Sequence, residues 1–225
     1  MIKKLFLSPV FALFFTGIMG ILCWIIFNHI SYDEVYFLTA DWGVVDTLTI
    51  GLWVFTFYLL SFFWVKGYIK VSNITICFML ILLMCAVVRE MGIQHCLTTS
   101  DTTPFKLNFF RKPTNPLGEK IIFGTVLLSL IGIIFYLIGC FFKKLWNGFL
   151  HFETPVWTFA TFSILLIGSK VLDRMPSKLA KNHIALSDTA HSAFSWFEET
   201  SEILLPVLLI ILLCQIFVIE KQDRK

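Results

Sequence analysis

The chain has 225 residues, of which 57% are hydrophobic and only 15% are charged; its formal net charge is +3 and its mean hydropathy is +0.82. A soluble domain carries about a quarter charged residues, so this composition excludes an ordinary water-soluble globular protein. The sequence contains no phosphate-binding loop, no Gly-rich dinucleotide fingerprint and no nucleic-acid-binding module, and we therefore expect no nucleic-acid partner.

Six apolar runs are about as long as a bilayer core is thick, which corresponds to roughly 20 residues of α-helix. In chain order they are residues 10–30, 47–65, 71–88, 121–142, 155–172 and 203–219. Each run must be helical, because backbone groups exposed to lipid have no water with which to bond. The sequence therefore predicts an all-α, polytopic membrane protein, a bundle of six transmembrane helices that forms a single membrane domain over residues 1–225.

The distribution of lysines predicts the orientation of this bundle. With six spans both termini lie on one side of the membrane, and lysines flank the helix ends in the short connectors of that side: Lys66, Lys70, Lys143 and Lys144. Positive charge in short loops next to helix ends favours the cytoplasmic side. We therefore predict a multi-pass protein with both termini in the cytoplasm.

Two longer outer loops, residues 89–120 and 173–202, contain nearly every side chain that could carry out chemistry. The stretches that bring these side chains to the outer boundary are "REMGIQH", "SKVLDRMP" and "HSAFSWFEETSE". If the last helix begins at Asp188 as its N-cap, then His191, Ser195, Glu198 and Glu202 follow at steps of four, three and four. That spacing places them in one polar stripe, and antiparallel packing would bring the other helix ends to the same level.

Roles for the residues of this outer layer follow from their chemistry. Lys170 is the only charge inside the fifth apolar run, so we expect it to pair with a carboxylate such as Glu90 or Glu202. The candidate groups for acid–base catalysis are Glu90, Glu199, Glu202 and Asp173. The candidate groups for orienting an anionic headgroup are Arg89, Lys170 and Arg174. The candidate ligands for zinc or iron are His95, His191, Glu90 and Glu202.

Two functional readings stay open at this point. The first is an integral membrane protein that binds or modifies a lipid or its headgroup at the outer layer, with or without a zinc or iron ion. The second is a non-catalytic membrane subunit or scaffold, bound to a membrane protein partner, in which the charged layer is structural. The metal hypothesis lacks a defined spacing such as HExxH or paired CxxC. Purely apolar span centres argue against an ion pathway through the bundle.

The segments "REMGIQH", "GEKIIFG", "SKVLDRMP" and "FEETSEILLP" carry a resemblance to other proteins. Together they resemble uncharacterised bacterial inner-membrane proteins of this size, over the third to the sixth predicted helix. This resemblance implies a location in the bacterial inner (cytoplasmic) membrane, and it implies no named activity.

Overall fold

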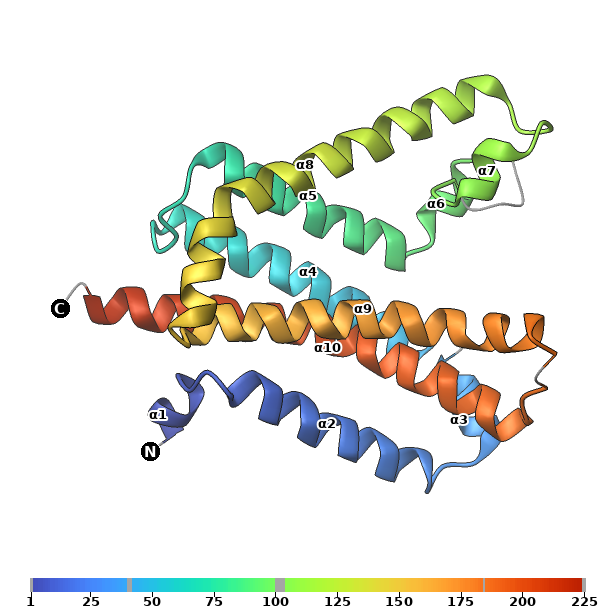
Figure 1. Cartoon of the computed structure of the whole chain (residues 1–225), viewed down its shortest axis with the longest axis horizontal. Helices are drawn as coiled ribbons and strands as arrows, with labels where there is room; N and C mark the ends of the chain where they lie inside the picture. Colours follow the sequence, from blue (N-terminus) through green and yellow to red (C-terminus); the bar gives the residue numbers. More distant parts are fainter. Residues whose placement is uncertain (1, 40–41, 100–103, 184, 224–225) are drawn as a thin grey trace. The chain divides into compact units, whose positions relative to one another are not determined.

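The computed structural model describes residues 2–39, 42–99, 104–183 and 185–223 (Figure 1), and the side chains of residues 2, 3, 32, 94, 95 and 223 are also outside this description. Every regular element within these ranges is a helix, which confirms the all-α prediction. The elements are α1 (Ile2–Phe6), α2 (Phe11–Phe27), α3 (Tyr32–Thr39), α4 (Val44–Val65), α5 (Asn73–Glu90), α6 (Ile93–Cys96), α7 (Leu107–Arg111), α8 (Leu117–Leu150), α9 (Thr154–Lys181) and α10 (Asp188–Asp223).

Five stretches, which contain α4, α5, α8, α9 and α10, are long and apolar enough to cross a membrane by length and composition. The multi-span prediction is thus supported for five of the six apolar runs. The remaining run corresponds to α2, an apolar helix of 17 residues. This length is at the short end of the roughly 17–25 residues that a span requires, so the sixth span stays a prediction.

The chain divides into two compact units, of which the first contains residues 1–69 and 147–225 and the second contains residues 70–146. The prediction of a single membrane domain over the whole chain stays a prediction.

In the first unit α10 is the central helix. It contacts α9, α4, α3 and α2, and α9 and α10 run side by side (Figure 1). Its apolar side chains Leu205 and Leu208 are buried, and the indole nitrogen of Trp196 donates a hydrogen bond to the carbonyl of Cys23, at 3.0 Å, which ties α10 to α2. A buried indole N–H needs such an acceptor, so this bond fixes the two helices in register.

A buried set of polar contacts, here called the N-terminal clasp, holds the start of the chain against α9 and α10. The hydroxyl of Thr158 donates to Oε1 of Gln215 at 2.7 Å, and Nε2 of Gln215 donates to the carbonyl of Phe6 at 3.0 Å. The hydroxyl of Thr154 donates to the carbonyl of Leu7 at 2.5 Å. The side chains thereby satisfy carbonyls at the end of α1 that have no partner within that short helix.

In the second unit α5 and α8 meet where the Tyr136 hydroxyl lies 3.3 Å from that of Thr75 and its ring contacts Phe78. The segment before α8 folds back onto this helix. Phe109 of α7 is fully buried against the ring of Phe123, and Nδ2 of Asn115 donates to the carbonyl of Phe109 at 2.8 Å. The described residues just before α8 in the predicted outer loop 89–120 are therefore packed against α8 through aromatic rings.

The second predicted outer loop, residues 173–202, is mostly helical. Helix α9 continues through Pro176 to Lys181, and α10 already begins at Asp188. The predicted spans 155–172 and 203–219 end or begin where hydropathy falls. The helices extend beyond these points, because the backbone hydrogen bonds of a helix can continue into water. The N-cap is also one residue earlier than expected, because the hydroxyl of Ser187 accepts the backbone N–H of Ala190 at 3.2 Å.

At the corner between α8 and α9, Gly148 leaves no room for a side chain. A Cβ atom there would lie 2.5 Å from Cγ2 of Val156 and 2.9 Å from Oε2 of Glu153. We expect Gly148→Ala to lower the free energy of unfolding by about 1–3 kcal/mol through overpacking, measured by thermal unfolding in detergent.

Two further variants separate this steric effect from a general effect of helix composition. Gly132→Ala in the same helix meets nothing within 4 Å and should be neutral or slightly stabilising. Gly148→Ala combined with Val156→Ala should be close in stability to Val156→Ala alone. Equal stability of Gly148→Ala and Gly132→Ala would contradict the close approach.

Candidate functional site

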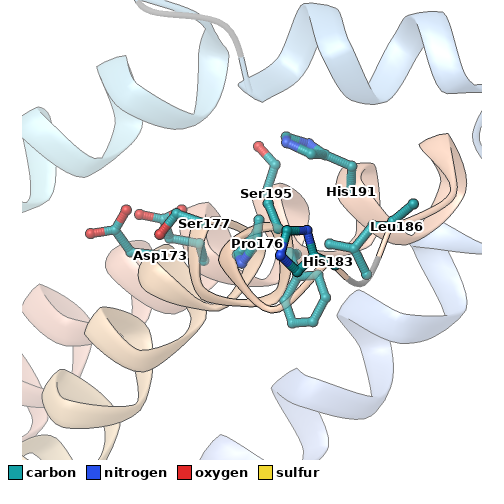
Figure 2. A pocket seen from close by; sticks show the side chains of 11 residues that line it. Asp173, Pro176, Ser177, His183, Leu186, His191 and Ser195 are labelled. Atoms are coloured by element: carbon teal, nitrogen blue, oxygen red, sulfur yellow. The ribbon is translucent and has the colours of Figure 1, made fainter.

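A cleft of about 760 Å³ lies between the C-terminal part of α9, the N-terminal part of α10 and the turn that joins them (Figure 2). Its apolar wall includes Pro176, Leu186 and Phe194. Its polar lining consists of Asp173, Ser177, His183, His191, Ser195 and Glu198. A mixture of apolar wall and a few polar groups is typical of small-molecule sites.

Helical spacing explains why these polar groups converge. Asp173 and Ser177 are four residues apart on α9 and share a face of that helix. His191, Ser195 and Glu198 follow at steps of four and three on α10, and Figure 2 shows His191 and Ser195 projecting in the same direction. Three members of the predicted polar stripe therefore line one cleft.

The turn between the two helices is held at both ends. His183 adopts a left-handed backbone conformation, with φ 59°, and its N–H donates to the carbonyl of Ala180 at 3.1 Å. Histidine is one of the residue types that occupy this conformation more often than most. At the other end, Ser187 caps α10. These contacts place the His183 side chain at the cleft.

An ion pair joins α9 and α10 one turn deeper into the apolar part of both helices. Nζ of Lys170 lies 2.5 Å from Oε1 of Glu202, and the two side chains are 34% and 10% exposed. Lys170 precedes Asp173 by three residues, and Glu202 follows Glu198 by four. The carboxylate partner that the sequence required for Lys170 is therefore Glu202, and the pair fixes the two cleft-forming helices to each other.

The other predicted residues lie elsewhere. In the second unit Arg89 and Glu90 end α5, with Nη2 of Arg89 3.6 Å from Oε1 of Glu90. The side chain of His95 lies outside the described part of the chain. In the first unit Arg174 is exposed and Glu199 is half-buried, and neither lines the cleft. A charged layer that joins the two units thus stays a prediction.

The metal hypothesis receives no support from the described side chains. Among them, no group of three or more His, Cys, Asp or Glu side chains could hold a metal ion. Glu202 pairs with Lys170, whereas His191 lines the cleft. A zinc or iron site that includes His95 stays a prediction, because the side chain of His95 lies outside the described part of the chain.

Four polar residues of the cleft have no predicted role: Ser177, His183, Ser195 and Glu198. The sequence places Ser195 and Glu198 in the polar stripe of the last helix, whereas it does not single out Ser177 and His183, which follow Asp173 along α9 and its terminal turn. The four-residue spacing of Asp173 and Ser177 was a usable signal, but the predicted span ended before both of them. His183 has no comparable signal, because its position depends on the conformation of the turn.

The fold and the cleft together define a class of protein: a helical protein with several candidate membrane spans and a polar cleft at the ends of two of them. No family model, curated protein or solved structure matches the chain.

Proposed function

We propose that this chain is an integral protein of the bacterial inner membrane that binds a lipid headgroup in the α9–α10 cleft. The observation that carries the proposal is the position of the cleft along two apolar helices. The apolar run of α9 ends at residue 172 and that of α10 begins at residue 203, while the cleft is lined by residues between them. With both runs in the hydrocarbon core, the cleft lies at the level of the lipid headgroups.

The size and chemistry of the cleft are appropriate for a headgroup. Its volume of about 760 Å³ is within the range of roughly 300–1,000 Å³ that is usual for small-molecule sites. Carboxylates, imidazoles and hydroxyls supply hydrogen-bonding groups, and Phe194 and Leu186 supply apolar contact. Acid–base chemistry on a bound headgroup would use Asp173 and Glu198, which lie in the cleft.

The set of residues that we propose to orient the headgroup's phosphate differs in part from the set predicted from the sequence. Lys170 is engaged by Glu202, so we assign it to holding the helices together. Arg174 directly follows Asp173 and is exposed, which suits it to a phosphate at the membrane surface.

The proposal includes the orientation of the chain. With α2 as the sixth span, both termini lie in the cytoplasm and the cleft faces the opposite side of the membrane. A topology reporter fused after Lys225 should therefore read as cytoplasmic, and a reporter inserted after Asn182 should not. The opposite pattern would overturn the orientation.

Lipid retention by the purified protein tests the binding function. The full chain is extracted in mild detergent, and its bound lipids are measured by native mass spectrometry. We expect Glu198→Gln to lose most of the lipid that the wild type retains. Glu153→Gln is the matched control, because it removes the same charge at the opposite end of α9, where Glu153 precedes the helix. Equal retention by all three proteins would overturn the proposal.

A specific observation also favours the scaffold as a second candidate function. The Lys170–Glu202 ion pair bridges two helices and needs no ligand to explain it. In that case the charged groups set the register of α9 and α10 for a membrane protein partner.

A further inference from the structure

We infer that the cleft between α9 and α10 takes a primary ammonium group. This inference rests on the headgroup-binding function proposed above and names the chemistry of its ligand. The two helices each contribute one carboxylate to the cleft, Asp173 from α9 and Glu198 from α10. A ligand between the helices thus meets an acidic group on both sides.

The charges in the cleft itself favour a cation. Of the described residues that line it, two are acidic and none is Lys or Arg. A phosphate placed inside would meet two groups of like charge, and the side chains of the described lining that could donate to it are imidazoles and hydroxyls, not a Lys or Arg. A primary ammonium group has three N–H donors, and a carboxylate offers about four acceptor positions, so Glu198 can accept a further bond beside any it already accepts. The hydroxyls of Ser177 and Ser195 provide additional acceptors.

Two other kinds of cation fit the lining less well. A quaternary ammonium group has no N–H to donate and is usually held by several aromatic rings. Phe194 is the single Phe, Tyr or Trp among the described residues of the lining. A metal ion needs several convergent ligands, and the described side chains form no group of three that could hold one.

Basic residues just outside the cleft suit the rest of an ethanolamine headgroup. Arg174 and Lys178 are exposed, and their four-residue spacing places them on one face of α9, adjacent in sequence to Asp173 and Ser177. In phosphatidylethanolamine two carbon atoms separate the ammonium nitrogen from the phosphate ester oxygen. A headgroup that places its ammonium in the cleft keeps its phosphate within a few bonds of that ammonium, and the guanidinium of Arg174 is a suitable partner for such a phosphate.

Competition between lipids tests this chemistry. The full chain in detergent is given equal amounts of phosphatidylethanolamine, phosphatidylcholine and phosphatidylglycerol with identical acyl chains, and the bound lipids are measured by native mass spectrometry. We expect a several-fold preference for phosphatidylethanolamine in the wild type and in Glu153→Gln. Asp173→Asn and Glu198→Gln, tested singly, should each reduce this preference several-fold. Because Asp173 is exposed, its substitution should leave the fold intact.

A second arm distinguishes a membrane lipid from a soluble amine. Displacement of the lipid by excess glycerophosphoethanolamine would support the ammonium site and identify the headgroup alone as sufficient. If glycerophosphoethanolamine did not displace the lipid while the preference for phosphatidylethanolamine persisted, the same ammonium site would be supported. In that case binding would also require the acyl chains of the lipid.

Two results would overturn the inference, and they separate it from the proposed function. Preferential binding of phosphatidylglycerol or phosphatidylcholine, lost in Glu198→Gln, would overturn the ammonium chemistry and leave headgroup binding in place. Lipid binding that is unchanged in both cleft variants would overturn headgroup binding in the cleft and the ammonium inference with it.

Discussion

Lys170→Met is expected to lower the free energy of unfolding by about 1–3 kcal/mol, because it removes the charged partner of a nearly buried carboxylate. Glu202 is 10% exposed in its side chain and lies 2.5 Å from the ammonium of Lys170. Methionine keeps much of the length and the apolar contact of lysine. The expected loss is smaller than for a fully buried pair, because Lys170 is itself 34% exposed. Reversible unfolding in mixed micelles would measure it.

Lys178→Met is the control for this substitution. It removes the same charge from the exposed last turn of α9 and should change stability by no more than a few tenths of a kcal/mol. A double variant with Glu202→Met should recover part of the lost stability, because no carboxylate is then left without its lysine. If Lys170→Met and Lys178→Met were equally stable, the ion pair would not hold the two helices together.

The two candidate functions predict opposite patterns in these variants. Headgroup binding in the cleft predicts that Glu198→Gln reduces lipid retention in a protein that is still folded. A purely structural charged layer predicts that Lys170→Met and Glu202→Gln reduce stability while Glu198→Gln changes neither property. Measuring lipid retention and unfolding on the same set of proteins therefore separates the two.

The apolar helices could be predicted from the sequence because lipid imposes a simple rule on composition. The predicted run 47–65 corresponds to α4 (Val44–Val65), and the run 71–88 corresponds to α5 (Asn73–Glu90). The ion pair of Lys170 was also predictable, since a single charge in an apolar run is costly and needs a partner. The choice of Glu202 over Glu90 required the packing of α9 against α10.

The cleft could be predicted only in part, because it depends on helix that continues beyond the apolar run. Asp173 and Pro176 together resemble a helix end, yet a proline removes a single backbone hydrogen bond, here to the carbonyl of Leu172. The helix therefore persists to Lys181 and carries Ser177 and the turn at His183 to the cleft. Hydropathy contains no information on such a continuation.

The N-terminal clasp shows a second limit of sequence reasoning. Gln215 and Thr158 are uncharged polar residues inside apolar runs, so neither interrupts the predicted spans. Their hydrogen bond joins positions 57 residues apart, and the bond to Phe6 joins positions 209 apart. Periodicity within one helix cannot indicate contacts over such distances, which follow only from how the helices pack.

The second large effect is expected for Gln215→Leu, which should lower the free energy of unfolding by about 1–3 kcal/mol by leaving two buried polar groups without their partner. Gln215 and Thr158 are both fully buried, and Gln215 accepts from the Thr158 hydroxyl while donating to the Phe6 carbonyl. Leucine has a similar volume but can do neither. The start of the chain should also be held less firmly, so trypsin should cleave after Lys4 faster than in the wild type.

A pair of isosteric substitutions on α9 isolates the role of the clasp. Thr158→Val removes the hydroxyl that bonds Gln215, whereas Thr161→Val removes one that bonds the carbonyl of Trp157 in its own helix. Both threonines are buried, so the two variants differ chiefly in whether a contact between helices is lost. We expect Thr158→Val to reproduce part of the Gln215→Leu effect on unfolding and on cleavage after Lys4, and Thr161→Val to change both much less. Equal effects of the two valines would show that the loss of a buried hydroxyl, rather than the clasp, determines stability here.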